Sequence, residues 1–187
     1  MAWFQTCWAF EESKHGLVFR EHLTRSGLRS EVEALQASVF AKAWTLPFET
    51  PRLMACYGAL QEGATYVAYK LQKDKAHCVG DPVLEAIFHL VGRDEAAHGG
   101  FYRAMIELEL SENRPATIGD LAEVLSNFKM PGDGLIANYR ERLRASGAGI
   151  STRAFVERVV WPLLTTLQIS RDELKKALKP RPIIAQI

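Results

Sequence analysis

Apolar residues recur at helical spacing along most of this 187-residue chain, and no stretch alternates with the period of two that is typical of a strand. Prolines, glycines and capping residues divide this pattern into segments. The pattern predicts long helices over residues 1–25, 30–44, 51–73 and 82–109, and shorter helices over 117–127, 135–145, 152–160 and 171–178. We therefore predict an all-α fold.

The expected breaks between these helices follow from turn-forming residues. Residues 111–115 are predicted to form a loop, and residues 130–134 a rigid turn. Pro162 is expected to interrupt the helix that precedes it. The tail from Pro180 onward is expected to fray.

Composition places the chain among ordinary globular proteins, with 48% hydrophobic and 24% charged residues. The net charge of +1 gives no general electrostatic reason to bind nucleic acid. The three cysteines form no Cys-x-x-Cys pair, which favours reduced thiols and a cytoplasmic location. No apolar run reaches the roughly 18–20 residues that a membrane span needs, and no secretory leader is visible.

Two segments about eighty residues apart each contain Glu-x-x-His: Glu12 with His15, and Glu95 with His98. Residues three apart on a helix share a face, so each segment presents a carboxylate and an imidazole together. Two such helices facing each other would bring two Glu and two His to one point, which is the main part of a carboxylate-bridged di-iron site. One such motif alone would be read as a surface pair, whereas two together favour a metal site.

The residues around each motif support this interpretation. Both motifs lie in apolar stripes with the same 4-3-4 spacing, where an unpaired carboxylate would be costly. These stripes consist of Trp8, Glu12, His15 and Phe19 in the first helix, and of Val91, Glu95, His98 and Tyr102 in the later one.

Two further acids are candidates for the same site. Glu62 lies in the helix predicted over 51–73, among small residues that permit close helix approach. Taken alone it would be a half-exposed surface acid, but between the two motifs it becomes a candidate ligand. Asp94 could hold a ligating imidazole through its free N–H. Asp94 could equally be a solvated acid paired with Arg93, and both interpretations stay open.

The ordered motifs carry a resemblance to a known family. The segment Trp8-Ala9-Phe10-Glu11-Glu12-Ser13-Lys14-His15-Gly16 resembles the Trp-x-x-Glu-Glu-x-x-His-Gly segment of soluble acyl-[acyl-carrier-protein] desaturases. Asp94-Glu95-Ala96-Ala97-His98 is similar to the family's Asp-Glu-x-x-His segment, and Gln61-Glu62-Gly63-Ala64-Thr65 to its Glu-x-x-Thr helix. The turn Phe128-Lys129-Met130-Pro131 and the helices after it are similar to the family's C-terminal part. The resemblance covers essentially the whole chain.

The resemblance implies a ferritin-like helical bundle, usually a homodimer, that holds two non-haem iron ions. It implies O2- and ferredoxin-dependent desaturation of an acyl chain carried on acyl carrier protein, in fatty acid biosynthesis. The chain would be one domain, with metal-binding helices in residues 1–110 and C-terminal helices in 111–187. The family's motifs imply a role for each matching residue. Glu12 and Glu95 would bridge the irons, His15 and His98 would each bind one iron, and Glu62 would be the terminal carboxylate on the His98 iron. Thr65 would face the O2 pocket, and Asp94 would hold a ligating imidazole. Phe19 and Tyr102 are candidates to line an apolar channel, although core packing is the simpler interpretation of each.

One departure from the family pattern affects the expected activity. The family's first metal-binding helix lies upstream of the Trp-x-x-Glu-Glu segment and contributes a fourth Glu. Here eleven residues precede Glu12, all within its own helix. The resemblance therefore leads us to expect a truncated member or a degenerate iron site, with weak turnover. A plastid location would follow if an upstream segment carried a transit peptide.

Two alternatives stay open at this stage. One is a ferritin-like iron-binding or peroxide-handling bundle, and the other is an inactive remnant that pairs with an intact subunit. Acidic partners such as acyl carrier protein and ferredoxin would dock on basic clusters, although a solvated helix face is the commoner explanation of such clusters. The candidates are Arg140, Arg142 and Arg144 in one cluster and Lys175, Lys176 and Lys179 in the other.

Overall fold

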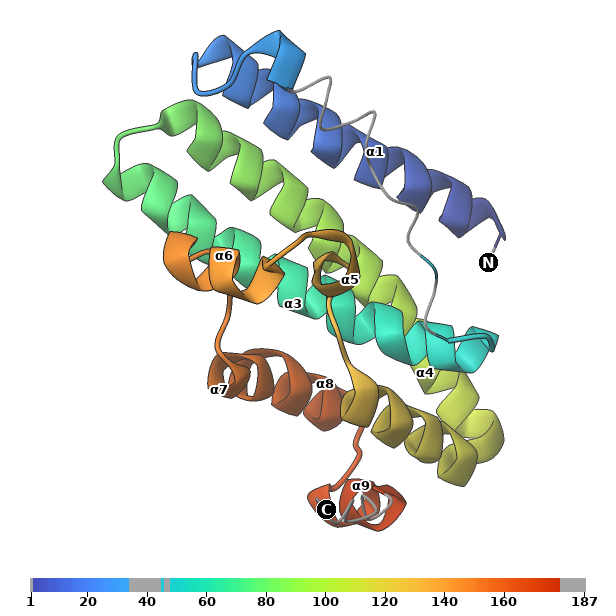
Figure 1. Ribbon diagram of the computed structural model, residues 1–187. Coiled ribbons are helices and arrows are strands. Elements are labelled where there is room, and N and C mark those ends of the chain that lie inside the picture. The colour runs from blue at the N-terminus through green and yellow to red at the C-terminus, as the bar shows by residue number, and fades with distance from the viewer. Residues whose placement is uncertain (1, 34–44, 46–47, 179–187) are drawn as a thin grey trace.

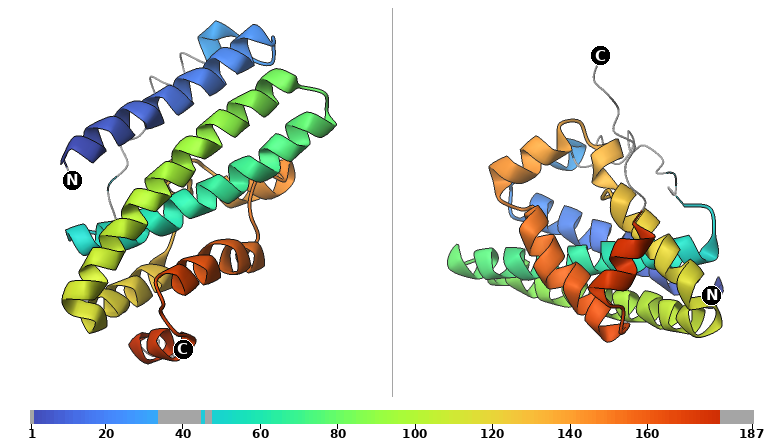
Figure 2. Two further views of the ribbon diagram at one scale, coloured as in Figure 1. Left: turned by 180° about the vertical axis from the view of Figure 1, so that it is seen from behind. Right: turned by 90° about the horizontal axis from the view of Figure 1, so that it is seen from below.

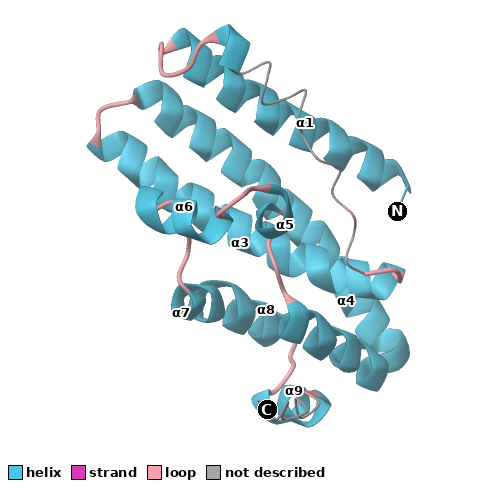
Figure 3. Ribbon diagram, viewed as in Figure 1, coloured by secondary structure: helices cyan, strands magenta, loops and turns pink. Residues whose placement is uncertain are grey.

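The computed structural model describes residues 2–33, 45 and 48–178, and every regular element in these ranges is a helix (Figure 3). The all-α prediction is therefore confirmed. The elements are α1 (Ala2–Arg25), α3 (Pro51–Cys78), α4 (Pro82–Asn127), α5 (Gly132–Leu135), α6 (Tyr139–Ser146), α7 (Thr152–Phe155), the π-helical turn η1 (Val156–Val160), α8 (Trp161–Thr166) and α9 (Arg171–Ala177). Ser30 and Glu33 form a capping box at the start of the helix predicted over residues 30–44, with the Ser30 amide 2.9 Å from the Glu33 carboxylate. The rest of that predicted helix lies outside the described residues.

Helices α3 and α4 form the long antiparallel pair on which the rest of the chain packs (Figure 1). Both begin at the predicted residues, 51 and 82, and in each a capping side chain is followed by proline. The Thr50 hydroxyl accepts a hydrogen bond from the Leu53 amide, and Asp81 Oδ1 accepts one from the Leu84 amide. Helix α3 runs five residues beyond the predicted end at Lys73 and stops before Gly80, whose φ of 74° turns the chain into α4.

Helix α1 lies along α4 and runs antiparallel to it, as the views in Figures 1 and 2 agree. Phe4 near the start of α1 stacks on Phe101, while Phe19 near its end packs against Phe88, earlier in α4. Helix α1 also touches α3, where Phe19 meets the ring of Tyr69. These three helices form the part of the ferritin-like bundle that holds the candidate site.

The predicted loop over residues 111–115 is reduced to a single non-helical residue. Asn113 has φ −149° and ψ 79°, and helix continues on both sides of it within α4. Its side-chain oxygen accepts a hydrogen bond from the Ala116 amide, which caps the segment that follows, and Pro115 lies in the first turn of that segment. The chain turns sharply here, so the end of α4 runs back beside the bundle (Figure 1).

The C-terminal part differs from prediction in three places. Most of the rigid turn predicted over residues 130–134 forms the one-turn helix α5. The helix expected over 135–145 begins at Tyr139, because Asn138 adopts the left-handed conformation with φ 56°. Pro162 does not interrupt its helix, because α7, η1 and α8 follow one another without a break. In a regular helix its ring would clash with the carbonyl four residues earlier. The wider π turn directly before it, with a hydrogen bond from the Trp161 amide to the Val156 carbonyl, allows the helix to continue.

The hydrophobic core lies between the α3–α4 pair and the C-terminal helices. Its most buried members include Leu60, Ile106 and Leu121, each with 0% exposure. Tyr102 packs so closely on α3 that a Cβ at Gly58 would lie 2.7 Å from its ring, which explains the glycine at that position. None of the helices in the described part of the chain is both long enough and apolar enough to cross a membrane.

Candidate metal centre

Three helices contribute to one buried cluster of carboxylates and imidazoles. Ligand atoms of Glu12 from α1, Glu62 from α3, and Glu95 and His98 from α4 all lie within 4.8 Å of one another. Glu62, Glu95 and His98 are each at most 1% exposed. Buried acids are normally paired or bound to metal, so this cluster is the natural place in the described chain to look for an ion.

His15 joins the cluster from the other side of Glu12 and Glu95. Its Nδ1 lies 3.4 Å from Glu95 Oε1 and 3.8 Å from Glu12 Oε2. His98 Nδ1 lies 3.5 Å from Glu12 Oε1 and 3.7 Å from Glu95 Oε2. Each of these two carboxylates therefore presents one oxygen to each imidazole, which is the arrangement that two bridging carboxylates between two ions require.

Five atoms of the cluster are buried without a hydrogen-bond partner, although nearly all buried polar atoms in proteins have one. They come from all three helices: Glu12 Oε1, His15 Nδ1, Glu62 Oε2, Glu95 Oε2 and His98 Nδ1. An ion bound among them would satisfy these atoms together. The donor set of carboxylate oxygens and imidazole nitrogens suits iron and similar transition metals. The residues present thus fit a metal centre.

The electrostatics of the cluster show how strongly its groups interact. Burial raises the pKa of Glu62, although its contact with His98 and the hydrogen bond from Trp8 oppose this. Burial alone would also raise the pKa of Glu95, but its contacts with His15 and His98 outweigh burial and lower it. Burial disfavours the charged form of His98, yet its contacts with the surrounding glutamates raise its pKa to about 12. A metal ion would therefore replace positive charge that protons otherwise supply.

The two ends of the centre, one at His15 and one at His98, differ in the carboxylates that they offer. Glu62 contacts His98, with its Oε2 lying 3.8 Å from His98 Nδ1, and so supplies a carboxylate to that end. Among the described residues, the acids that meet His15 Nδ1 are Glu12 and Glu95, while Asp94 binds the opposite ring nitrogen. The role of Glu62 as the terminal carboxylate at the His98 end stays a prediction.

The outer nitrogen of each histidine binds an acid that directly precedes a glutamate of the cluster. His15 Nε2 lies 3.0 Å from Asp94 Oδ2, which resolves the two interpretations of Asp94 in favour of an imidazole contact. His98 Nε2 lies 2.7 Å from Glu11 Oε2, a contact that the sequence analysis missed. The adjacent acids in Glu11-Glu12 and Asp94-Glu95 were the signal that could have revealed it.

Trp8 has a polar role that was also missed. Its indole Nε1 donates a hydrogen bond of 2.9 Å to Glu62 Oε1, so α1 fixes one oxygen of the acid that α3 contributes. In the sequence Trp8 was noted as part of an apolar stripe and of the Trp-x-x-Glu-Glu motif, with no hydrogen-bond partner assigned to it. An indole N–H that is largely removed from water usually finds an acceptor, and the nearby candidate acids could have suggested one.

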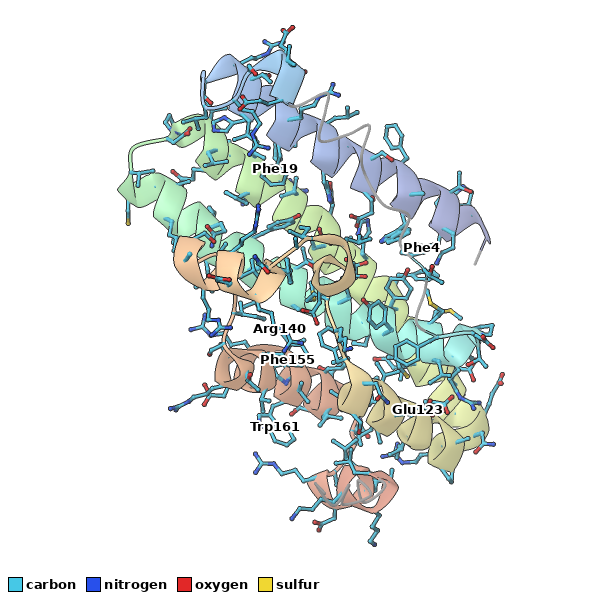
Figure 4. The ribbon with its side chains drawn as sticks, in the orientation of Figure 1. Phe4, Phe19, Glu123, Arg140, Phe155 and Trp161 are labelled. Carbon is cyan, nitrogen blue, oxygen red and sulfur yellow. The ribbon has the colours of Figure 1, made fainter. Side chains whose placement is uncertain are left out.

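Aromatic side chains lie at both ends of the cluster. Phe4 and Phe19 point from α1 toward the α3–α4 pair (Figure 4), and Phe4 also meets the edge of His98 at 6.1 Å between ring centroids. Tyr102, with 2% exposure, is a core residue whose hydroxyl accepts a hydrogen bond from Gln5. The hydroxyl of Thr65 donates to the Gln61 carbonyl, one turn back in α3. The O2-pocket role of Thr65 stays a prediction, as do the ligand roles of the five cluster residues.

Comparisons with known proteins bear on this site. The family model described as fatty acid desaturase matches residues 1–156. The acyl-[acyl-carrier-protein] desaturase DesA1 of Mycobacterium tuberculosis (strain CDC 1551 / Oshkosh) is 26% identical over 175 residues, which cover 89% of this chain and 52% of that protein. The chloroplastic stearoyl-[acyl-carrier-protein] 9-desaturase 6 of Arabidopsis thaliana is 28% identical over 121 residues, covering 63% of this chain and 31% of that protein.

The chain thus spans about half the length of the mycobacterial relative. The matched region contains all three helices of the metal centre, and both relatives carry the name that the motifs suggest. The chain belongs to the fatty acid desaturase family, as its resemblance to the acyl-[acyl-carrier-protein] desaturases predicts.

Proposed function

We propose that this chain carries the metal-binding part of an acyl-[acyl-carrier-protein] desaturase, with two non-haem iron ions in the carboxylate–histidine cluster. The observation that supports this most directly is the meeting of two Glu-x-x-His motifs and a third glutamate in one buried site whose inward atoms lack other partners. The names of the relatives supply the substrate class, a fatty acyl chain on acyl carrier protein. Ferredoxin as electron donor and a homodimer belong to the same proposal.

In this proposal each side chain has a distinct task. Glu12 and Glu95 would be available to both ions, because each faces both imidazoles. His15 and His98 each offer Nδ1 to one ion, and Glu62 completes the His98 end. When bound, the irons would supply the O2-dependent redox chemistry that removes hydrogen from the acyl chain. Carboxylates suit such ions because they can bridge two metals.

The surroundings of the cluster would keep water away from it. The ring of Phe4 stacks on Phe101 at one end, with 3.5 Å between centroids. At the other end Phe19 meets Tyr69 and Phe88 at 5.8 and 5.1 Å. Apolar rings beside a site limit the access of water, which strengthens electrostatic interactions inside it and reduces side reactions. This is the environment that oxidation of an unactivated alkyl chain requires.

Docking of an acidic carrier protein would use basic side chains, and the structure narrows the candidates. Arg140 is already held by Asp133 through two hydrogen bonds of 2.9 and 2.8 Å. Arg142 and Arg144 are exposed on α6, and Lys175 and Lys176 are exposed on α9, whereas Lys179 lies outside the described residues. Arg142 and Lys175 are therefore the residues to reverse in charge when carrier binding is measured.

A second candidate function is iron binding without desaturation. It is favoured by the His15 end, where the described residues offer the shared glutamates but no further carboxylate at Nδ1. An ion held with fewer carboxylates should bind less tightly there. Such a centre would fill unequally and turn over slowly, while the His98 end would still hold its metal.

The test begins with anaerobic reconstitution with ferrous iron and measurement of bound iron per chain. His15→Ala and His98→Ala should each lose iron, whereas His89→Ala, an exposed histidine on α4, should bind as much as the parent. The loaded protein is then given O2, reduced ferredoxin and a saturated acyl-[acyl-carrier-protein]. A double bond in the product supports the desaturase proposal, and iron binding without product supports the second candidate. Equal iron binding by all four proteins would refute the site.

A further inference from the structure

In each cluster histidine, the ring nitrogen that faces away from the cluster, Nε2, contacts an acid on the other helix. Glu11 of α1 reaches His98 of α4, and Asp94 of α4 reaches His15 of α1. The two contacts therefore cross between the helices. Because neighbouring residues on a helix point about 100° apart, the acid before each cluster glutamate cannot face the centre itself, but it can reach the partner helix.

These contacts fix which nitrogen of each ring faces the cluster. An ionised carboxylate only accepts hydrogen bonds, so Nε2 of the histidine must donate. That leaves Nδ1 of His98 directed at Glu12 and Glu95, and Nδ1 is the atom that has no other partner. An outer acid in this position orients a ligating imidazole and makes it more basic.

The two crossed contacts differ in how many basic side chains pair with the acid. Asp94 also forms an ion pair of 2.7 Å with Lys14, the residue directly before His15. The equivalent position before His98 is Ala97, which is exposed and has no charge. Within the described part of the chain, His98 is the one basic side chain that pairs with Glu11. Asp94 is shared between Lys14 and His15, whereas Glu11 pairs with His98 alone among the described residues.

We propose that Glu11 is a positioning residue for His98, and that the unshared charge of Glu11 makes the metal at the His98 end the more tightly held of the two. The inference rests on the proposed metal site but goes beyond it, because it assigns a role to Glu11 and a cause to the inequality of the two ends. It adds to the effect of Glu62, since Glu11 acts through the imidazole and Glu62 lies on the cluster side.

The experiment uses the full chain loaded anaerobically with ⁵⁷Fe(II) and examined by Mössbauer spectroscopy, with affinity measured by metal competition. Glu11→Gln should lower the affinity of the tighter site about 10- to 100-fold and shift the signal of one iron. Asp94→Asn should shift the other signal. Glu21→Gln is the matched control, because Glu21 is an exposed acid on the same helix that pairs with Arg25. It should change neither signal nor affinity.

Two further variants separate positioning from folding. Glu11→Asp keeps the charge and should restore part of the lost affinity, with helical content by circular dichroism unchanged in all variants. Ala97→Lys copies the Lys14 arrangement and should weaken the same site that Glu11→Gln weakens. If the parent binds two irons but Glu11→Gln leaves both signals and affinities intact, or shifts both equally, the inference is wrong and the metal site stands. If the parent binds no iron, both are wrong.

Discussion

Helices α1 and α3 both contribute to the metal centre, yet different forces hold them in place. Ten of the 28 residues of α3 are buried, and eight of these are apolar or glycine side chains in addition to Tyr57 and Glu62. In α1, His15 is the one buried residue among those whose exposure is described. Packing in the hydrophobic core fixes helix α3, whereas α1 is fixed largely by the contacts that its side chains make in and around the metal centre.

The outward face of α1 makes the contrast clearer. Trp3, Phe10 and Leu17 recur at intervals of seven residues and are 81%, 70% and 52% exposed. Among the described residues, little packs against this apolar area. The contacts that hold α1 are instead the aromatic pairs at its ends and the polar contacts of Trp8, Glu11 and His15 near its middle. A change at the centre should therefore affect α1 before it affects α3.

The largest difference between the two helices is expected in the reactivity of their cysteine thiols, Cys7 on α1 and Cys56 on α3. Cys7 is exposed, while Cys56 is fully buried and burial raises its pKa to about 12. Only the thiolate reacts with disulfide reagents. Relative to a thiol with the ordinary pKa of about 8.5, ionisation alone should slow Cys56 at pH 8 by about three orders of magnitude. Stopped-flow reaction with an aromatic disulfide, followed by mass mapping, measures both rates.

Cys78 serves as the internal control, because it is exposed at the end of α3. It should react as readily as Cys7, which would show that burial and not membership of α3 protects Cys56. In denaturant all three should react alike. Rapid labelling of Cys56 in the native protein would mean that the α3 core opens as readily as α1.

The second contrast compares one substitution in the two helices. Leu60→Ala removes a side chain with 0% exposure from the core and should cost about 2–5 kcal/mol of unfolding free energy. Leu17→Ala removes the same atoms from the outward face of α1 and should change stability by about 0.5 kcal/mol or less. Urea denaturation followed by circular dichroism measures both. Comparable losses would show that the outer face of α1 is covered in solution.

The third prediction compares how hydrogen exchange in α1 and in α3 responds to metal binding. Because ligands on α1 must meet ligands on α3 and α4, an ion that binds the assembled centre stabilises the docked state of α1. At 100 times the dissociation constant this amounts to about 2.7 kcal/mol, or about 100-fold slower exchange by opening of α1. Amide hydrogen exchange of residues 2–25 should slow on anaerobic loading with Fe(II), while the buried part of α3 changes little.

His15→Ala combined with His98→Ala provides the control for this experiment, because that protein should not load. Its α1 amides should exchange at the metal-free rate with or without iron. If α1 and α3 gain protection equally in the parent, then the centre stabilises the whole bundle and α1 is not a separate unit.

The sequence predicted the parts of this arrangement that depend on periodicity and local chemistry. Prolines and capping residues in the sequence located the starts of α3 and α4 correctly, at residues 51 and 82, although the cap that Thr50 supplies was not predicted. The single-residue corner at Asn113 and the π turn before Pro162 were not predicted. Both depend on how a helix accommodates proline under tertiary packing, which local propensity does not encode.

The same limit applies to the site. The Glu-x-x-His spacing was enough to predict that Glu12, Glu95 and His98 would meet, because it depends only on helix geometry. The contacts of Glu11 and Trp8 depend instead on the relative rotation of α1 and its neighbours. That rotation is set by packing at Phe4 and Phe19, and the sequence does not specify it locally.

The smallest expected effect concerns Asp81, which contacts both α4 and α1. One oxygen caps α4 by accepting the Leu84 amide at 2.8 Å, and the other lies 3.1 Å from Nε2 of His22, in the last turn of α1. Asp81→Ala removes the cap and the contact with α1. Asp81→Ser should keep a cap, since serine is also favoured at this position, but its shorter side chain should lose His22.

The two variants therefore separate the two roles. Their difference in unfolding free energy should be about 1 kcal/mol, the usual value of a helix cap, and it belongs to α4. The loss that Asp81→Ser itself causes belongs to the docking of α1, and should appear as faster hydrogen exchange near His22 with little change in α3. His22 is largely buried, with its side chain 8% exposed, so the contact is shielded from solvent and can stabilise more than a surface pair does. If Asp81→Ser exchanges like the parent in residues 18–25, the contact between Asp81 and His22 does not hold the end of α1, and the aromatic contacts of Phe19 must hold it instead.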